Sequence, residues 1–157
     1  MENYEVAQIC LNGHCINSNA NSFASFNSAF CPICGAETTM SCSKCKAPIR
    51  GKYPGIEKYV VPNYCHNCGK PYPWTESAIQ AAAELLTLDD NLSIEETQIL
   101  VDALPDLLSE TPKTQLAVAK FKKFLSASGR FTVDGVRQFA IDFGCAYVKS
   151  ELSKLGL

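Results

Sequence analysis

Two Cys-x-x-Cys pairs restrict the fold of this 157-residue chain more than any other feature of its sequence. They are Cys42-Ser43-Lys44-Cys45 and Cys65-His66-Asn67-Cys68. Two residues between a pair of cysteines place both thiolates on one edge of a tetrahedron, which is the geometry of a structural zinc ion. We therefore expect these four cysteines to bind one zinc ion and to hold the loops around it.

A second, less regular set of candidate ligands precedes this site. Cys31-Pro32-Ile33-Cys34-Gly35 repeats the same spacing, and Cys10 is followed by Gly13, which tolerates the positive φ of a tight turn. The fourth ligand is either His14 or Cys15. We favour His14, because a histidine directly after the turn glycine is well placed to supply a nitrogen ligand.

The pairing of the ligands decides whether the chain has two separate zinc modules. Sequential pairing keeps each loop short, and an interleaved cross-brace is the alternative, because spacing alone does not fix connectivity. A structural zinc ion contributes about 10–16 kcal/mol to the folding of a small peptide, far more than so small an apolar core supplies. We predict tandem zinc ribbons over residues 1–74, with one site over about 4–36 and the other over about 37–74. The predicted ligands of the two structural Zn²⁺ ions are Cys10, His14, Cys31 and Cys34, and Cys42, Cys45, Cys65 and Cys68.

The cysteine content indicates a reducing compartment. The chain has nine cysteines, an odd number, and eight of them precede residue 69. Its first residues lack the basic and apolar regions of a signal peptide, and no apolar run of about 18 residues is present to span a membrane. Metal binding therefore explains the cysteines better than a disulfide framework does, and we expect a cytoplasmic protein that does not associate with membranes.

The second half of the chain changes to a helical pattern, with apolar residues recurring at a period near 3.6. The predicted helices cover about 75–87, the segment from the capping box at Ser93 to Pro105, the segment from Thr111-Pro112 to Gly129, and about 133–152. The last of these includes Cys145, which we interpret as a buried apolar residue. The predicted fold class is a small zinc-stabilised β region of tandem zinc ribbons followed by an all-α, four-helix C-terminal domain over residues 75–157.

A basic and aromatic loop between the last two cysteine pairs is the strongest local indication of nucleic-acid binding. Cations interleaved with tyrosines are typical of surfaces that bind single strands. The residues of this surface would be Lys44, Lys46, Arg50, Lys52, Tyr53, Lys58 and Tyr59. Global charge gives no support, because residues 1–75 carry six basic and four acidic side chains and the thiolate ligands bring this metal-loaded half close to −1.

The same features exclude most enzyme classes. Both predicted sites have four protein ligands, whereas a catalytic zinc ion keeps a position for water. Only two histidines are present, and His66 lies inside a cysteine pair, where it cannot easily act as a general base. We therefore expect a non-catalytic adaptor whose partner is another protein and which takes no small-molecule substrate. The alternative is a nucleic-acid-binding zinc ribbon that uses the basic loop.

Four motifs together resemble a bacterial domain-of-unknown-function family, number twenty-three twenty-one. They are Cys-Leu-Asn-Gly-His at 10–14, Cys-Pro-Ile-Cys-Gly at 31–35, Ile-Arg-Gly at 49–51 and Cys-Gly-Lys-Pro-Tyr-Pro-Trp-Thr at 68–75. The resemblance implies zinc-ribbon knuckles followed by a helical tail over nearly the whole chain, and a bacterial origin. It also implies that His14 occupies the ligand position and that Cys15 is an extra cysteine. It implies no activity.

Overall fold

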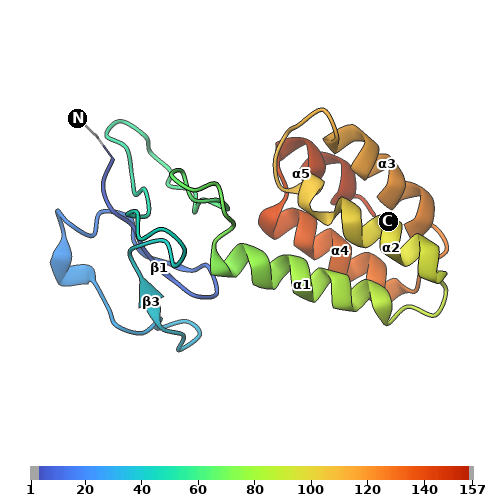
Figure 1. Ribbon diagram of the computed structural model, residues 1–157, viewed down its shortest axis with the longest axis horizontal. Helices are drawn as coiled ribbons and strands as arrows, with labels where there is room; N and C mark the ends of the chain where they lie inside the picture. The colour runs from blue at the N-terminus through green and yellow to red at the C-terminus, as the bar shows by residue number, and fades with distance from the viewer. Residues whose placement is uncertain (1–3, 156–157) are drawn as a thin grey trace. The chain divides into compact units, whose positions relative to one another are not determined.

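The computed structural model describes residues 4–155. The chain forms two compact units, one ending at Ser77 and the other beginning at Ala78 (Figure 1). Helix α1, Pro73–Thr87, contains the boundary between them.

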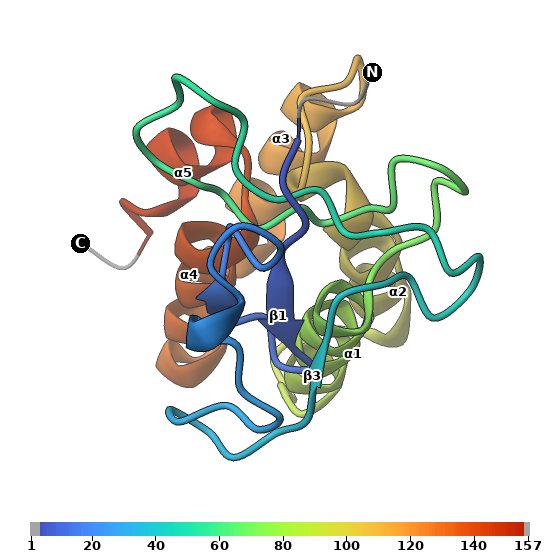
Figure 2. The same cartoon turned by 90° about the vertical axis from the view of Figure 1, so that its left-hand side faces the viewer.

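The first unit is built around a small antiparallel sheet. Strand β1, Gln8–Cys10, lies between β2, Cys15–Asn17, and β3, Thr38–Thr39, so the strand order is β2-β1-β3. Strands β1 and β3 are labelled in Figure 2. Every residue of β1 is buried, and both edges of the strand are paired. A short 3-10 helix, η1, covers Ala24–Phe26. The expected small β region with cysteine groups is confirmed.

Trp74 belongs to the core of this first unit. Its indole stacks on Tyr72, with ring centroids 4.6 Å apart, and its Nε1 donates a hydrogen bond of 2.9 Å to the Pro62 carbonyl. A Cβ added to Gly13 would lie 3.0 Å from the Trp74 Cβ, so the turn after Cys10 packs directly on this tryptophan. The single tryptophan of the chain therefore contacts segments that lead to both cysteine groups.

The second unit is entirely helical, which confirms the predicted class of the C-terminal half. After α1 come α2, Ile94–Ala103, the 3-10 turn η2, Leu104–Leu107, and α3, Thr114–Leu125. The last two helices are α4, Arg130–Phe143, and α5, Ala146–Leu152 (Figure 1). The capping box at the start of α2 forms as expected, because Ser93 Oγ accepts from Glu96 N–H at 3.1 Å and Glu96 accepts from Ser93 N–H at 2.9 Å.

The predicted four-helix count is wrong, because the segment expected as one last helix forms two. Gly144 ends α4 in an extended conformation, with φ −65° and ψ 152°, and Cys145 N–H donates to the Leu107 carbonyl instead of continuing the helix. A Cβ at Gly144 would lie 2.5 Å from the Ala140 oxygen, so the tight break requires glycine. The apolar spacing continues across it, since Val148 and Leu152 of α5 are also buried, and periodicity alone could not reveal the break.

The buried carboxylate of Asp89 links the loop after α1 to the start of α4 through hydrogen bonds. Asp89 accepts hydrogen bonds from the Asn91 backbone at 2.9 Å, from the Asn91 side chain at 3.0 Å and from Gly129 N–H at 2.8 Å. Burial raises the pKa of Asp89, but the hydrogen bonds that its carboxylate accepts lower the pKa by more, so the net pKa is depressed. A depressed carboxyl pKa contributes stability that is present above the unfolded value of about 3.9 and is lost as the pH falls through the folded value.

Replacing Asp89 with Asn is expected to destabilise the helical unit by about 1–3 kcal/mol at pH 7, because charge-assisted hydrogen bonds are lost. Urea unfolding followed by the circular dichroism of the helices measures this change. The difference between variant and wild type should shrink as the pH is lowered from 7 towards 3. The control is Asp90→Asn at the exposed neighbour. Equal effects of the two substitutions would contradict the assigned role of Asp89.

Candidate metal centres

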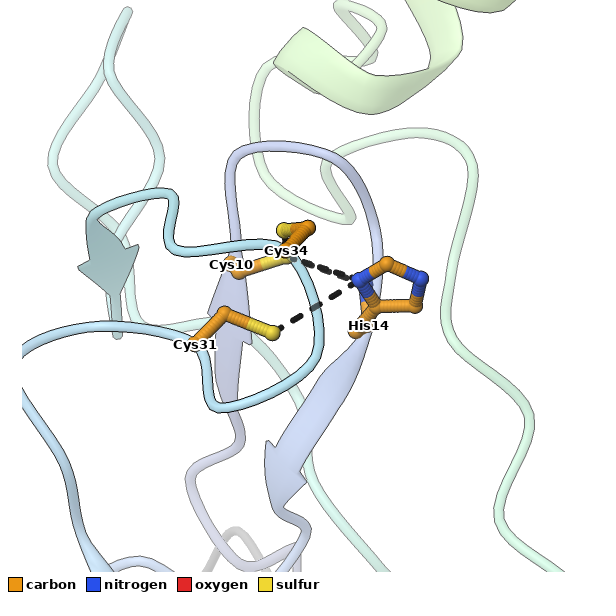
Figure 3. Close-up of side chains that lie close together, drawn as sticks. All are labelled: Cys10, His14, Cys31 and Cys34. Carbon is orange, nitrogen blue, oxygen red and sulfur yellow. Dashed lines mark hydrogen bonds between the residues drawn. The ribbon is translucent and has the colours of Figure 1, made fainter.

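The first cysteine group brings together residues from three segments. Cys10 ends β1, His14 directly precedes β2, and Cys31 and Cys34 lie in the loop before β3 (Figure 3). The Nδ1 atom of His14 lies 3.5 Å from Cys10 Sγ and 3.6 Å from Cys31 Sγ, and the sulfurs of Cys10 and Cys34 are 3.8 Å apart. All four ligand atoms lie within 4.8 Å of one another.

The second group consists of Cys42, Cys45, Cys65 and Cys68. The sulfurs of Cys42 and Cys68 are 3.8 Å apart, and those of Cys45 and Cys65 are 3.6 Å apart. Sequence reasoning left sequential and interleaved pairing open. The structure groups the first four candidate ligands and the last four separately.

These distances match the edges of a coordination tetrahedron. With metal–sulfur bonds of about 2.3 Å and metal–nitrogen bonds of about 2.0–2.1 Å, tetrahedral angles give sulfur–sulfur edges of about 3.8 Å and sulfur–nitrogen edges of about 3.6 Å. A disulfide would instead bring two sulfurs to about 2.05 Å. Both groups are therefore positioned to hold a four-coordinate metal ion.

The three Cys-x-x-Cys loops share one backbone conformation, which explains why the spacing is so informative. In each, the N–H of the first cysteine donates to the carbonyl five residues later, and its own carbonyl accepts from the N–H four residues later. The N–H groups of Ile33, Lys44 and Asn67 each lie 3.4 Å from the sulfur of the first cysteine. Such N–H···S bonds favour the thiolate, which is the form that binds metal.

The residue after each Cys-x-x-Cys pair adopts a left-handed conformation. Gly35 has φ 75° and Gly69 has φ 69°, and the equivalent position in the middle loop is Lys46, with φ 66°. The sequence shows the turn glycine in only two of the three loops, and it indicates Lys46 only as a candidate nucleic-acid-binding cation. The backbone of Lys46 also forms the turn that closes the middle Cys-x-x-Cys loop, in a conformation that is uncommon for a residue other than glycine.

In each group, an asparagine side chain donates a hydrogen bond to the sulfur of one cysteine. Asn12 Nδ2 lies 3.3 Å from Cys34 Sγ, and Asn67 Nδ2 lies 3.5 Å from Cys45 Sγ. The Ala36 N–H and the Asn12 side chain lower the pKa of the Cys34 thiol to about 6. The Ala47 N–H and Asn67 lower the pKa of Cys45 in the same way. Sequence reasoning missed both asparagines, because only the folded loops bring them to sulfurs 22 residues away.

His14 and Cys15 have different surroundings. The Nδ1 atom of His14 faces the sulfurs of the first group (Figure 3), whereas Cys15 is exposed in β2 and lies outside both groups. Consecutive residues entering a strand point to opposite sides, so both cannot face the same ion. Cys145 also lies outside both groups.

The candidate nucleic-acid residues are divided between two places. Lys44 and Lys46 lie on the middle Cys-x-x-Cys loop, where Lys44 forms an exposed ion pair of 3.9 Å with Glu76. The other candidates, Arg50, Lys52, Tyr53, Lys58 and Tyr59, line one cavity of about 340 Å³. Tyr4 completes this cavity, and sequence reasoning missed it because the Val6–Arg50 bridge that brings the N-terminal segment there has no local signal.

No helix within residues 4–155 is both long and apolar enough to cross a membrane. Searches among curated proteins and among solved structures find no match to this chain. A family profile described as "Uncharacterized protein conserved in bacteria (DUF2321)" matches residues 3–152, which is nearly the whole chain. This match confirms the resemblance drawn from the four motifs. The chain therefore belongs to this family of uncharacterized proteins conserved in bacteria.

Proposed function

We propose that this chain is a non-catalytic protein-interaction protein built on two structural zinc ions. The observation that carries the proposal is that each candidate metal centre brings four protein donors within 4.8 Å of one another, with adjacent donors 3.5–3.8 Å apart. Four protein ligands fill the coordination of zinc, so no position is left for the water or substrate of a catalytic ion. Donor sets of three cysteines with one histidine, and of four cysteines, are typical of structural zinc.

Exposed apolar side chains in the segment between the ligands His14 and Cys34 support a protein partner. Phe26 is 69% exposed and Ile33, which lies between two ligand cysteines, is 72% exposed. Phe23 and Phe30 are also exposed, and Phe23 contacts Phe26 with ring centroids 6.4 Å apart. Large apolar side chains held on a rigid metal-braced loop suit the buried core of a protein interface. We propose a cytoplasmic location, because free thiolate ligands persist in a reducing compartment.

The test is a quantitative affinity purification with the full-length, zinc-loaded chain as bait. A double variant, Phe26→Ser with Ile33→Ser, is compared with Ile94→Ser and Leu116→Ser, which remove exposed apolar side chains from the helical unit. We expect a partner that binds the wild type and the Ile94→Ser, Leu116→Ser variant but does not bind the Phe26→Ser, Ile33→Ser variant. All three proteins should contain two zinc ions. Recovery of the same proteins by all three would contradict the proposed surface.

Nucleic-acid binding is the second candidate function. The observation that favours it is the cavity that gathers Arg50, Lys52 and Lys58 with three tyrosines. The two functions can be tested separately. An adaptor complex should keep its affinity when Lys52 and Lys58 are replaced with Gln, whereas nucleic-acid binding should weaken.

A further inference from the structure

One cavity of the first unit combines aromatic rings with positive charge. Its rings are Tyr4, Tyr53 and Tyr59, and its cations are Arg50, Lys52 and Lys58. The remaining lining residues are uncharged: Gly51, Ile56, Val60 and Pro62. The cavity therefore offers flat apolar surface and positive charge side by side, with no carboxylate among the described residues that line it.

The three cations of the cavity have no ionic partner in the part of the chain that the structure describes. Within residues 4–155, none of Arg50, Lys52 and Lys58 forms a salt bridge. The Nε atom of Arg50 is also buried without a hydrogen-bond partner. A buried donor without an acceptor costs free energy, and native proteins keep such groups mainly where they have a task. The charge of this cavity is thus available to an anionic ligand.

The backbone around Arg50 and Lys52 is held in place before any ligand binds. The N–H groups of Gly51 and Lys52 donate to the carbonyls of Glu5 and Ser18, and Glu5 N–H donates to the Lys52 carbonyl at 3.1 Å. Tyr59 Oη donates to the Arg50 carbonyl at 2.7 Å. A ligand that meets a fixed backbone loses less affinity to ordering than one that must organise a mobile loop.

The rings present stacking surface next to the guanidinium. The Arg50 guanidinium carbon lies 4.6 Å from the centroid of the Tyr4 ring, and the Tyr4 and Tyr53 centroids are 5.1 Å apart at an angle of 56°. Tyr4 is 42% and Tyr53 38% exposed, so each keeps part of its ring accessible. Bases stack on such rings and on guanidinium planes, while lysines contact phosphate.

We propose that this cavity binds a nucleoside monophosphate unit, either free or as part of a single strand. The base stacks on Tyr53, and the phosphate is bound by Lys52 and Lys58 beside Arg50. A volume of about 340 Å³ is at the small end of the range for ligand sites, so the cavity takes one unit. This inference deepens the second candidate function and does not depend on the adaptor role.

The experiment measures fluorescence anisotropy of a labelled 12-nucleotide single-stranded RNA titrated with the full-length, zinc-loaded protein at 50 and 200 mM salt. We expect binding that weakens with salt, and weaker binding of a duplex of the same sequence. Unlabelled adenosine monophosphate is added as competitor. Displacement of the strand assigns the site to the mononucleotide as well, and failure to displace it restricts the site to strands.

Two matched pairs of variants locate the binding in this cavity. Lys52→Gln with Lys58→Gln should lower the slope of log affinity against log salt by about 0.7, because the two lysines bind one phosphate and each phosphate contact in a single strand contributes about 0.7. Lys113→Gln with Lys149→Gln, on the helical unit, should leave the slope unchanged. Tyr53→Leu should weaken binding about tenfold, whereas Tyr53→Phe, which keeps the ring, should not.

The proposal is overturned by any of three results. These are no binding of the strand at 50 mM salt, equal loss in the two lysine double variants, and equal binding by Tyr53→Leu and Tyr53→Phe. Partner capture by the exposed phenylalanines is measured in a separate experiment. The nucleotide-binding proposal and the adaptor proposal can therefore fail independently.

Discussion

Replacing Cys68 with Ser is expected to release the second metal ion and unfold the loops that it holds. Cys68 Sγ is one corner of the second tetrahedron, 3.8 Å from Cys42 Sγ. A structural zinc ion contributes about 10–16 kcal/mol to small metal domains, as much as or more than the entire stability of a typical protein. Three remaining ligands cannot hold the ion with comparable affinity, so we expect the bound metal to fall from two ions per chain to one.

The single tryptophan reports this change. Trp74 is buried against Tyr72, and its Nε1 donates a hydrogen bond to the Pro62 carbonyl. Pro62 and Tyr72 flank the loop that carries Cys65 and Cys68. The emission of Trp74 should shift to longer wavelength when that loop unfolds. Cys15→Ser, a control outside both groups, should keep two ions and native emission. Full metal content and native emission in the Cys68 variant would contradict the assignment.

Replacing Gly51 with Ala is expected to destabilise the first unit by about 3 kcal/mol, at the upper end of the usual cost of overpacking. A Cβ at this position would lie 2.3 Å from the Ser18 carbonyl oxygen and 2.8 Å from the Val6 carbonyl carbon. Both are backbone atoms, so the clash cannot be relieved by rotating a side chain. Residues 50–52 and the N-terminal segment with which they pair must then move apart.

Gly55 provides the matched control for this prediction. A Cβ there meets nothing within 4 Å, but φ is +91°, so Gly55→Ala should cost only the local strain of about 1 kcal/mol. The midpoint of thermal unfolding, followed by Trp74 emission with zinc present, compares the two variants. Equal midpoints for Gly51→Ala and Gly55→Ala would show that the close backbone packing at Gly51 is not needed.

Local signals carried most of what could be predicted from the sequence. The Cys-x-x-Cys spacing reflects a backbone conformation repeated in all three loops, and the Ser93 capping box is complete within four residues. Each depends only on neighbours in the chain. The choice of His14 over Cys15 was open in the sequence, and the fold places Nδ1 of His14 among the sulfurs because β1 and β2 pair around the turn at Gly13.

What the sequence could not reveal depends on contacts between distant segments. The break at Gly144 is fixed by the Cys145 hydrogen bond to Leu107, while the apolar period continues undisturbed. Asn12 and Asn67 reach sulfurs 22 residues away. Tyr4 joins Arg50 only because the two segments pair. Periodicity and motif spacing contain no information on such contacts, so the cavity appears only in the folded chain.

Metal analysis of the purified chain tests the central claim most directly. Inductively coupled plasma mass spectrometry should find two zinc ions per chain and no iron. Cobalt substitution should then give tetrahedral absorption bands from both centres, with His14→Ala altering one set and Cys15→Ser altering neither. One ion or none per chain, or iron in place of zinc, would contradict the account of two structural zinc centres.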